Sequence, residues 1–148
     1  KTLLPYHVNG YSLLCAMACL THRDAFAPQI GEIRDQRDLM AQNLEDMGMQ
    51  VWPSQTNFLC YRPAGRLQEL LARAYDQKYG PNNLSQPSKA GKYLFKALLE
   101  DKILLRDFTE HPALPGCLRQ SVGLPGENAV VLGKLRALCR AIVGNEEI

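Results

Sequence analysis

The sequence lacks any long apolar segment, any strong excess of charge and any signal for secretion. No apolar run reaches the roughly 18 residues that a membrane span needs, so we expect no association with a membrane. The formal net charge is only +2 at pH 7 and the basic residues are scattered, which argues against nucleic acid as a partner. The first ten residues, KTLLPYHVNG, contain no long apolar core and no small-residue cleavage site, so they do not predict a signal peptide.

The cysteines and histidines form no pattern that indicates a metal site or a disulfide framework. The chain has five cysteines, and the one close pair, Cys15 and Cys19, has no second pair or matching histidines to complete a zinc site. We therefore expect free, buried thiols that behave as small apolar residues, in a reducing, cytoplasmic compartment. His7, His22 and His111 show no metal-binding or triad spacing and are interpreted as surface or structural residues.

The length of 148 residues fits one compact domain with a single core, and the sequence contains no internal repeat. The chain begins at Lys1 rather than Met, which favours a piece of a longer protein. Apolar residues recur at helical spacing in several segments, and between them the period shortens to that of strands. Helices are predicted at 11–23, 28–47, about 67–74, about 94–99 and about 131–142. Strands are predicted at 51–52, 56–61, 103–105 and 117–122, and a polar surface loop at 80–89.

These elements predict an α/β protein of the α+β type, in which helices cover one face of a short, mostly antiparallel sheet. The segment 11–23 is almost continuously apolar, so this helix is expected to be buried on most sides, with Asn9 or Ser12 capping its start. Gly48 occupies the place of a left-handed cap after the second helix. The segment 53–58, PSQTNF, is typical of a turn that leads into a strand.

Two arginines lie within or at the end of short apolar strands. Arg106 follows the segment ILL, and Arg119 lies inside the segment CLRQSVG. A single arginine in a strand is usually an edge residue or one partner of a structural ion pair. If the two strands are neighbours, the two guanidinium groups could instead converge on one anion, since each can donate two parallel hydrogen bonds to a phosphate or carboxylate.

Three segments in a fixed order resemble the histidinol-phosphate aminotransferases. They are PYHVN at 5–9, PSQTNFLCYR at 53–62 and ILLRDFTEHPALPGCLRQSVGLPGEN at 103–128. That family belongs to the class II aminotransferases, within the fold-type I enzymes that use pyridoxal phosphate. The resemblance implies that 1–24 is an interdomain helix segment and that 25–148 is the C-terminal small domain. The large domain that binds the cofactor would lie outside this chain.

The resemblance also implies roles for both arginines as substrate-binding residues. Arg119 matches the arginine that binds the substrate's carboxylate in fold-type I aminotransferases, and Arg106 matches a second anion ligand. The substrates would be histidinol phosphate and glutamate or 2-oxoglutarate, in histidine biosynthesis. The resemblance implies no catalytic, cofactor-binding or metal-binding residue in this chain. The complete enzyme would be a cytoplasmic homodimer, and the chain alone would be inactive.

The sequence departs from the family pattern at several points. Leu124 stands before Pro125 where the family commonly has a threonine that can cap the last helix, although Pro125 still suits a first helical position. The segment 62–103 is longer than one helix requires, which predicts an insertion. Lys89 lies in a Ser-Lys-Ala segment but follows a polar loop, so it is not expected to be the cofactor lysine. Alternatives are a threonine-phosphate decarboxylase, an aromatic aminotransferase, or a non-catalytic domain that binds an anion or a partner.

Overall fold

The computed structural model describes residues 8–144, so most of the PYHVN motif, including His7, lies outside the described residues. The chain divides into two compact units, Lys1–Glu32 and Ile33–Ile148, and each is considered by itself. Across residues 8–144, none of the helices is both long enough and apolar enough to cross a membrane.

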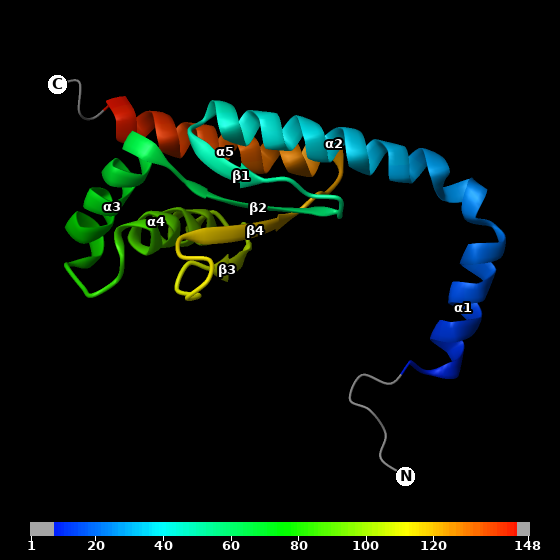
Figure 1. Ribbon diagram of the computed structural model, residues 1–148. Helices are drawn as coiled ribbons and strands as arrows, with labels where there is room; N and C mark the ends of the chain where they lie inside the picture. Colours follow the sequence, from blue (N-terminus) through cyan, green and yellow to red (C-terminus); the bar gives the residue numbers. More distant parts are fainter. Residues whose placement is uncertain (1–7, 145–148) are drawn as a thin grey trace, which may run out of the picture. The chain divides into compact units, whose positions relative to one another are not determined.

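The first unit contains helix α1 (Gly10–Thr21), the short 3-10 helix η1 (Arg23–Phe26) and the start of α2 (Ala27–Asp46) (Figure 1). The side chain of Asn9 caps α1 and accepts a hydrogen bond from the Ser12 amide at 2.8 Å, as one of the two predicted caps. The prediction that this helix is buried was wrong, because none of its residues is buried. A helix that is apolar all round needs neighbours on all sides, and the short helices of this unit do not provide them. Cys15 and Cys19 are consequently exposed, against the expectation of buried thiols.

The second unit is built on a four-stranded antiparallel sheet. Its strands are β1 (Met49–Trp52), β2 (Phe58–Pro63), β3 (Arg106–Phe108) and β4 (Cys117–Ser121), in the order β1-β2-β4-β3. All three pairings are antiparallel, which confirms the predicted sheet. Strand β3 is therefore an edge strand, and β4 lies between β2 and β3.

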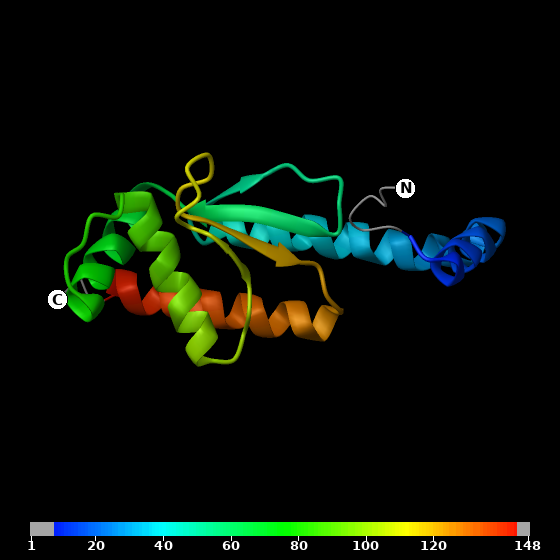
Figure 2. The same ribbon diagram turned by 90° about the horizontal axis from the view of Figure 1, so that it is seen from below.

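Helices α3 (Gly65–Tyr79), α4 (Gln86–Glu100) and α5 (Pro125–Gly144) pack with the second half of α2 on one face of this sheet (Figures 1 and 2). Strand side chains alternate between the two faces, and on β2 those facing the helices are buried while those between them are only partly covered. On β4, Leu118 and Gln120 face the helices and are buried, whereas Arg119 is partly covered and Ser121 is exposed. Buried residues of the helix-covered face include Leu59, Tyr61, Leu118 and Gln120. The opposite face, here called the open face, carries Phe58, Cys60, Arg106, Arg119 and Ser121. The fold class is thus the predicted α+β arrangement.

The predicted loop at 80–89 is too long. The turn-rich part ends at Ser85, whose hydroxyl caps α4 by accepting a hydrogen bond from the Ser88 amide, and Pro87 lies in the first turn of this helix. Ser88 is buried and Lys89 forms an ion pair with Asp76, so neither belongs to a free surface loop. A serine followed by proline near a helix start is a common capping pattern, and here it outweighs the polar composition.

The predicted strand at 103–105 was also placed wrongly, because β3 begins only at Arg106. The chain turns after α4 at Lys102, which has a positive φ of 62°, and then passes along the core, where Leu105 is buried and Leu104 is exposed. The segment between β2 and β3 contains two helices, α3 and α4, which confirms that it is longer than one helix requires.

Candidate anion-binding site

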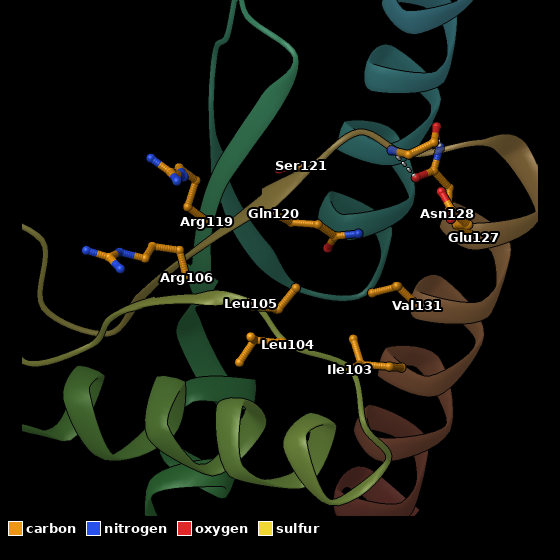
Figure 3. A pocket seen from close by; sticks show the side chains of 11 residues that line it. Ile103, Leu104, Leu105, Arg106, Arg119, Gln120, Ser121, Glu127, Asn128 and Val131 are labelled. Atoms are coloured by element: carbon orange, nitrogen blue, oxygen red, sulfur yellow. Dashed lines mark hydrogen bonds between the residues drawn. The ribbon is translucent and has the colours of Figure 1, made fainter. Parts of the chain in front are cut away.

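Arg106 and Arg119 are direct partners in the pairing of β3 with β4. Their side chains leave the sheet on the same face, lie side by side and extend in the same direction (Figure 3). Gln120, the next residue after Arg119, points the other way and is buried. The antiparallel register thus brings together the two arginines that sequence reasoning selected, 13 positions apart in the chain.

Two aromatic rings of the open face support the guanidinium groups. The guanidinium carbon of Arg119 lies 4.8 Å from the ring centre of Phe58 and 5.9 Å from that of Phe108. The guanidinium carbon of Arg106 lies 5.8 Å from the same Phe108 ring. Cations over aromatic faces are attracted by the ring quadrupole, and the flat guanidinium also packs against the ring. Phe108 therefore contacts both arginines and limits the directions in which they can extend.

No carboxylate neutralises this pair within residues 8–144, where neither Arg106 nor Arg119 forms an ion pair. Asp107 is adjacent in sequence but faces the helices, where it binds Lys92 at 2.8 Å. The interpretation of Arg119 as a structural ion-pair partner therefore finds no support in the described part of the chain. Arg106 does lie on an edge strand, as the simpler interpretation expected. Two unneutralised guanidinium groups side by side are suited to bind an anion with two or more oxygen atoms.

A pocket of about 270 Å³ begins beside the two arginines. Its other walls come from the segment between α4 and β3 and from the start of α5, as Figure 3 shows. The side chains of Ile103, Gln120 and Val131 lie on the side of the pocket away from the arginines, and the guanidinium groups of Arg106 and Arg119 extend away from these side chains (Figure 3). The two guanidinium groups therefore lie on the open face beside the pocket, not inside it.

The start of α5 was the part of this site that sequence reasoning missed. The Glu127 carboxylate accepts a hydrogen bond from the Leu124 amide at 2.9 Å, so a cap is present although the threonine is not. Asn128 is buried and exchanges two hydrogen bonds with the backbone of Gly123, at 2.9 and 3.0 Å. Pro125 is the first residue of α5, as predicted. The glutamate three residues after Leu124 was the available signal, because it has the spacing of a capping box.

The PSQTNF segment is a turn, as its composition indicated. The Ser54 hydroxyl donates to the Phe58 carbonyl oxygen at 2.7 Å and accepts from the Thr56 amide at 3.1 Å. The Asn57 carbonyl oxygen accepts a hydrogen bond from the Val122 amide at 2.8 Å, which joins this turn to the end of β4. The turn therefore fixes the start of β2, the strand that carries Phe58.

Two thiols lie close to the arginines on the open face. Cys60 is the direct partner of Arg119 in the pairing of β2 with β4. Burial raises the pKa of Cys60, and the charge of Arg119 and a hydrogen bond with Cys117 only partly offset this effect. Burial also raises the pKa of Cys117 to about 11. Both groups therefore remain neutral thiols at neutral pH, and the charge of this face comes from the arginines.

Four of the lysines of residues 8–144 are bound to carboxylates. Lys89 is bound to Asp76 at 2.9 Å. Lys92 binds two carboxylates, and Lys78 and Lys134 bind one each. The described residues also contain no group of three or more histidine, cysteine or acidic side chains that could hold a metal ion. What this face offers chemically is recognition of an anion.

Comparison with known proteins places this chain in an enzyme family. Residues 8–135 match the family model of the class I and II aminotransferases, so the chain belongs to that family. It is 32% identical over 143 residues to histidinol-phosphate aminotransferase 2 of Bordetella bronchiseptica, covering 95% of this chain and 33% of the relative. It is 34% identical over 139 residues to the histidinol-phosphate aminotransferase of Acidovorax sp. (strain JS42), covering 93% and 31%. The corresponding protein of Synechococcus sp. (strain JA-3-3Ab) is 31% identical over 138 residues.

The family resemblance expected from the three sequence motifs is thereby confirmed. This chain spans about one third of the length of the curated relatives it matches. Membership of an aminotransferase family implies pyridoxal phosphate as the cofactor of the whole protein.

Proposed function

We propose that this chain is the C-terminal small domain of a pyridoxal-phosphate-dependent histidinol-phosphate aminotransferase, in which Arg119 and Arg106 bind the anionic group of the substrate. Residues 1–24 would form the interdomain helix segment and 25–148 the small domain. The observation that carries the proposal is the direct pairing of the two arginines on the open face, without a carboxylate partner among residues 8–144. The names of the relatives support the choice of substrate.

A phosphate is the anion that best suits two adjacent guanidinium groups. Each guanidinium can donate two parallel hydrogen bonds, and a phosphate dianion has three equivalent oxygen atoms and a second charge to use them. A carboxylate has two oxygen atoms and can be held by one arginine. In the proposed reaction, histidinol phosphate and 2-oxoglutarate give imidazole acetol phosphate and glutamate. Arg119 would then bind the phosphate in one half-reaction and a carboxylate in the other, while Arg106 would contribute mainly to the phosphate.

The contribution of this chain is the orientation of the substrate. The cofactor, held by the rest of the protein, would supply the electron sink for transamination. The complete enzyme is proposed to be a cytoplasmic homodimer. This chain alone is expected to bind pyridoxal phosphate neither covalently nor productively, and covalent binding that disappears in Lys89→Ala would overturn this expectation.

The experiment is a comparison of substrates with the complete protein that carries this chain. We expect kcat/KM to be highest for histidinol phosphate, and inorganic phosphate to compete with it. Activity with phenylalanine but not with histidinol phosphate would indicate an aromatic aminotransferase. Release of carbon dioxide from threonine phosphate would indicate the related decarboxylase. The absence of all three activities in the folded, cofactor-loaded protein would favour a domain that only binds an anion or a partner.

A further inference from the structure

A cluster of charged residues lies directly behind Arg106, on the helix-covered side of β3. Lys92 of α4 donates to the Asp107 carboxylate at 2.8 Å and to the Glu110 carboxylate at 2.6 Å. The side chains of Lys92 and Asp107 retain only 20% and 25% of their exposure. A lysine held by two carboxylates is far more restricted than a single surface ion pair, which contributes little by itself.

The same cluster continues into the segment that connects β3 with β4. The second carboxylate oxygen of Asp107 accepts hydrogen bonds from the Thr109 amide at 2.8 Å and from its hydroxyl at 2.6 Å. Thr109 is fully buried, and its carbonyl oxygen accepts a hydrogen bond from the Gly116 amide at 2.9 Å. Asp107 therefore connects α4, β3 and the segment 109–116.

Strand β3 needs such support because of its length and position. It contains only three residues and pairs on one side only, with β4. Asp107 is its middle residue and points toward the helices, while Arg106 points to the open face. A short edge strand has few ladder hydrogen bonds, so a bond at its centre from a helix limits its movement relative to the sheet.

We infer that Lys92 is a positioning residue for substrate binding: by holding Asp107 and Glu110, it fixes β3 so that the guanidinium of Arg106 stays beside that of Arg119. This inference rests on the proposed function of the two arginines. It also gives a role to α4, which lies in the segment that is longer than one helix requires.

The titration behaviour of the cluster agrees with a tight network. Burial alone would raise the pKa of Asp107, but the hydrogen bonds from Lys92 and Thr109 outweigh it and lower the pKa. Burial alone would lower the pKa of Lys92, but the hydrogen bonds to Asp107 and Glu110 outweigh it and raise the pKa. The charged forms of both groups are thus stabilised by their contacts, and the network persists across the pH range in which an aminotransferase would be assayed.

The test uses Lys92→Met in the complete enzyme, because methionine keeps the length and apolar stem but loses the charge. We expect KM for histidinol phosphate to rise about ten-fold, while KM for glutamate changes less than about three-fold, since Arg119 alone can hold a carboxylate. Lys92→Arg should restore most of the affinity, because a guanidinium can bind both carboxylates. The matched control is Lys89→Met, which breaks the ion pair with Asp76 on the same helix. It should lower thermal stability and leave both KM values unchanged.

A double-mutant cycle separates this inference from the proposed function. If Lys92 acts through Arg106, Lys92→Met should have no further effect on KM for histidinol phosphate in an Arg106→Lys background. If Arg106→Lys alone leaves that KM unchanged, the proposed function of the arginine is wrong. If Arg106→Lys raises KM but Lys92→Met behaves like Lys89→Met, only the positioning role is wrong. Should Lys92→Met fail to fold, Asp107→Asn takes its place in the same cycle. A loss of effect on KM for histidinol phosphate in the Arg106→Lys background supports the positioning role, and behaviour like that of Lys89→Met contradicts it.

Discussion

Arg106 and Arg119 face each other directly across two antiparallel strands, without a carboxylate partner among residues 8–144. Like charges at directly opposite positions of a sheet are destabilising, so this arrangement has a cost in the free energy of folding. Proteins retain local arrangements of this kind mainly at functional sites, where a bound ligand compensates for them. If the pair binds an anion as proposed, the bound anion would offset this cost and stabilise the sheet.

The cost should be measurable by removing one of the two charges. Arg106→Thr should raise the free energy of unfolding of this chain by about 0.2 to 1 kcal/mol, because it removes the repulsion and places a β-branched residue in a strand. Urea denaturation measures the change. The gain should shrink in 1 M NaCl, where the Debye length is only about 3 Å. A loss of stability would mean that the contact of Arg106 with Phe108 outweighs the repulsion.

The same charges should be indispensable for activity in the complete enzyme. Arg119→Lys keeps the charge but loses the fork of donors and the flat group that lies over Phe58. Losing a charge-assisted pair in a closed site costs on the order of 2 to 5 kcal/mol, which corresponds to a fall in kcat/KM of roughly 30- to 4,000-fold. We expect this fall for histidinol phosphate and glutamate alike. Arg106→Lys should affect histidinol phosphate more than glutamate.

Steady-state kinetics and thermal denaturation of the same variant decide between a binding role and a structural one. A binding role predicts a large loss of kcat/KM with a small change in Tm. A structural role for Arg119 predicts the reverse, with kcat/KM within a few-fold of the wild type. Arg136→Lys is a suitable control, since this arginine lies on α5 and donates to Asn43 of α2. It should change Tm and leave kcat/KM unaltered.

Much of this fold could be predicted from the sequence, because its signals are local. The periodicity of α5 and the alternation along β2 depend on neighbouring residues only, and both were identified. The burial of α1 was predicted wrongly, because burial depends on neighbours that the periodicity of a helix does not specify. The position of β3 was also missed, because the apolar segment 103–105 lines the core without forming ladder hydrogen bonds.

The site could be predicted in part, because only some of its signals are local in the sequence. Arg106 and Arg119 were found because an arginine inside an apolar strand is conspicuous in sequence. Their exact pairing depends on the register of β3 and β4, and the hydrogen bonds of Asn128 and Glu127 depend on the fold around Gly123. The ion pair between Lys92 and Asp107 joins residues 15 positions apart on two different elements, and no local pattern indicates it.

The Lys92–Asp107 pair should give the chain a defined pH dependence of stability. The folded pKa of Asp107 lies below 3.8, so its contribution is complete above that value and is lost as the pH falls through the folded pKa. The folded pKa of Lys92 lies above 10.5, so its contribution is complete below that value and is lost as the pH rises through the folded pKa. We expect Lys92→Met to cost about 1 to 3 kcal/mol at neutral pH, from charged hydrogen bonds. The difference from the wild type should disappear at strongly acidic pH, and a difference that does not change with pH would contradict the assignment.

The contact between α4 and the segment before β4 leaves no room for a side chain. A Cβ on Gly91 would overlap the carbonyl oxygen of Gly116, and a Cβ on Gly116 would overlap that of Pro87. Gly116 also has a φ of 80°, which other residues rarely adopt, so the segment cannot easily move away. Gly91→Ala should therefore lower the free energy of unfolding by about 1 to 3 kcal/mol through overpacking, although alanine is the better helix former.

Gly133→Ala supplies the matched control, because Gly133 lies in the middle of α5 and no atom of residues 8–144 lies within 4 Å of the position of its Cβ, apart from its chain neighbours and the helix's own backbone. There the same change should raise the free energy of unfolding by about 0.5 to 1 kcal/mol, since alanine loses less backbone entropy in a helix. The two variants should thus shift the urea midpoint in opposite directions. If Gly91→Ala also stabilises the chain, α4 does not pack closely against Gly116. The support that Lys92 of the same helix gives to β3 would then have to be reconsidered as well.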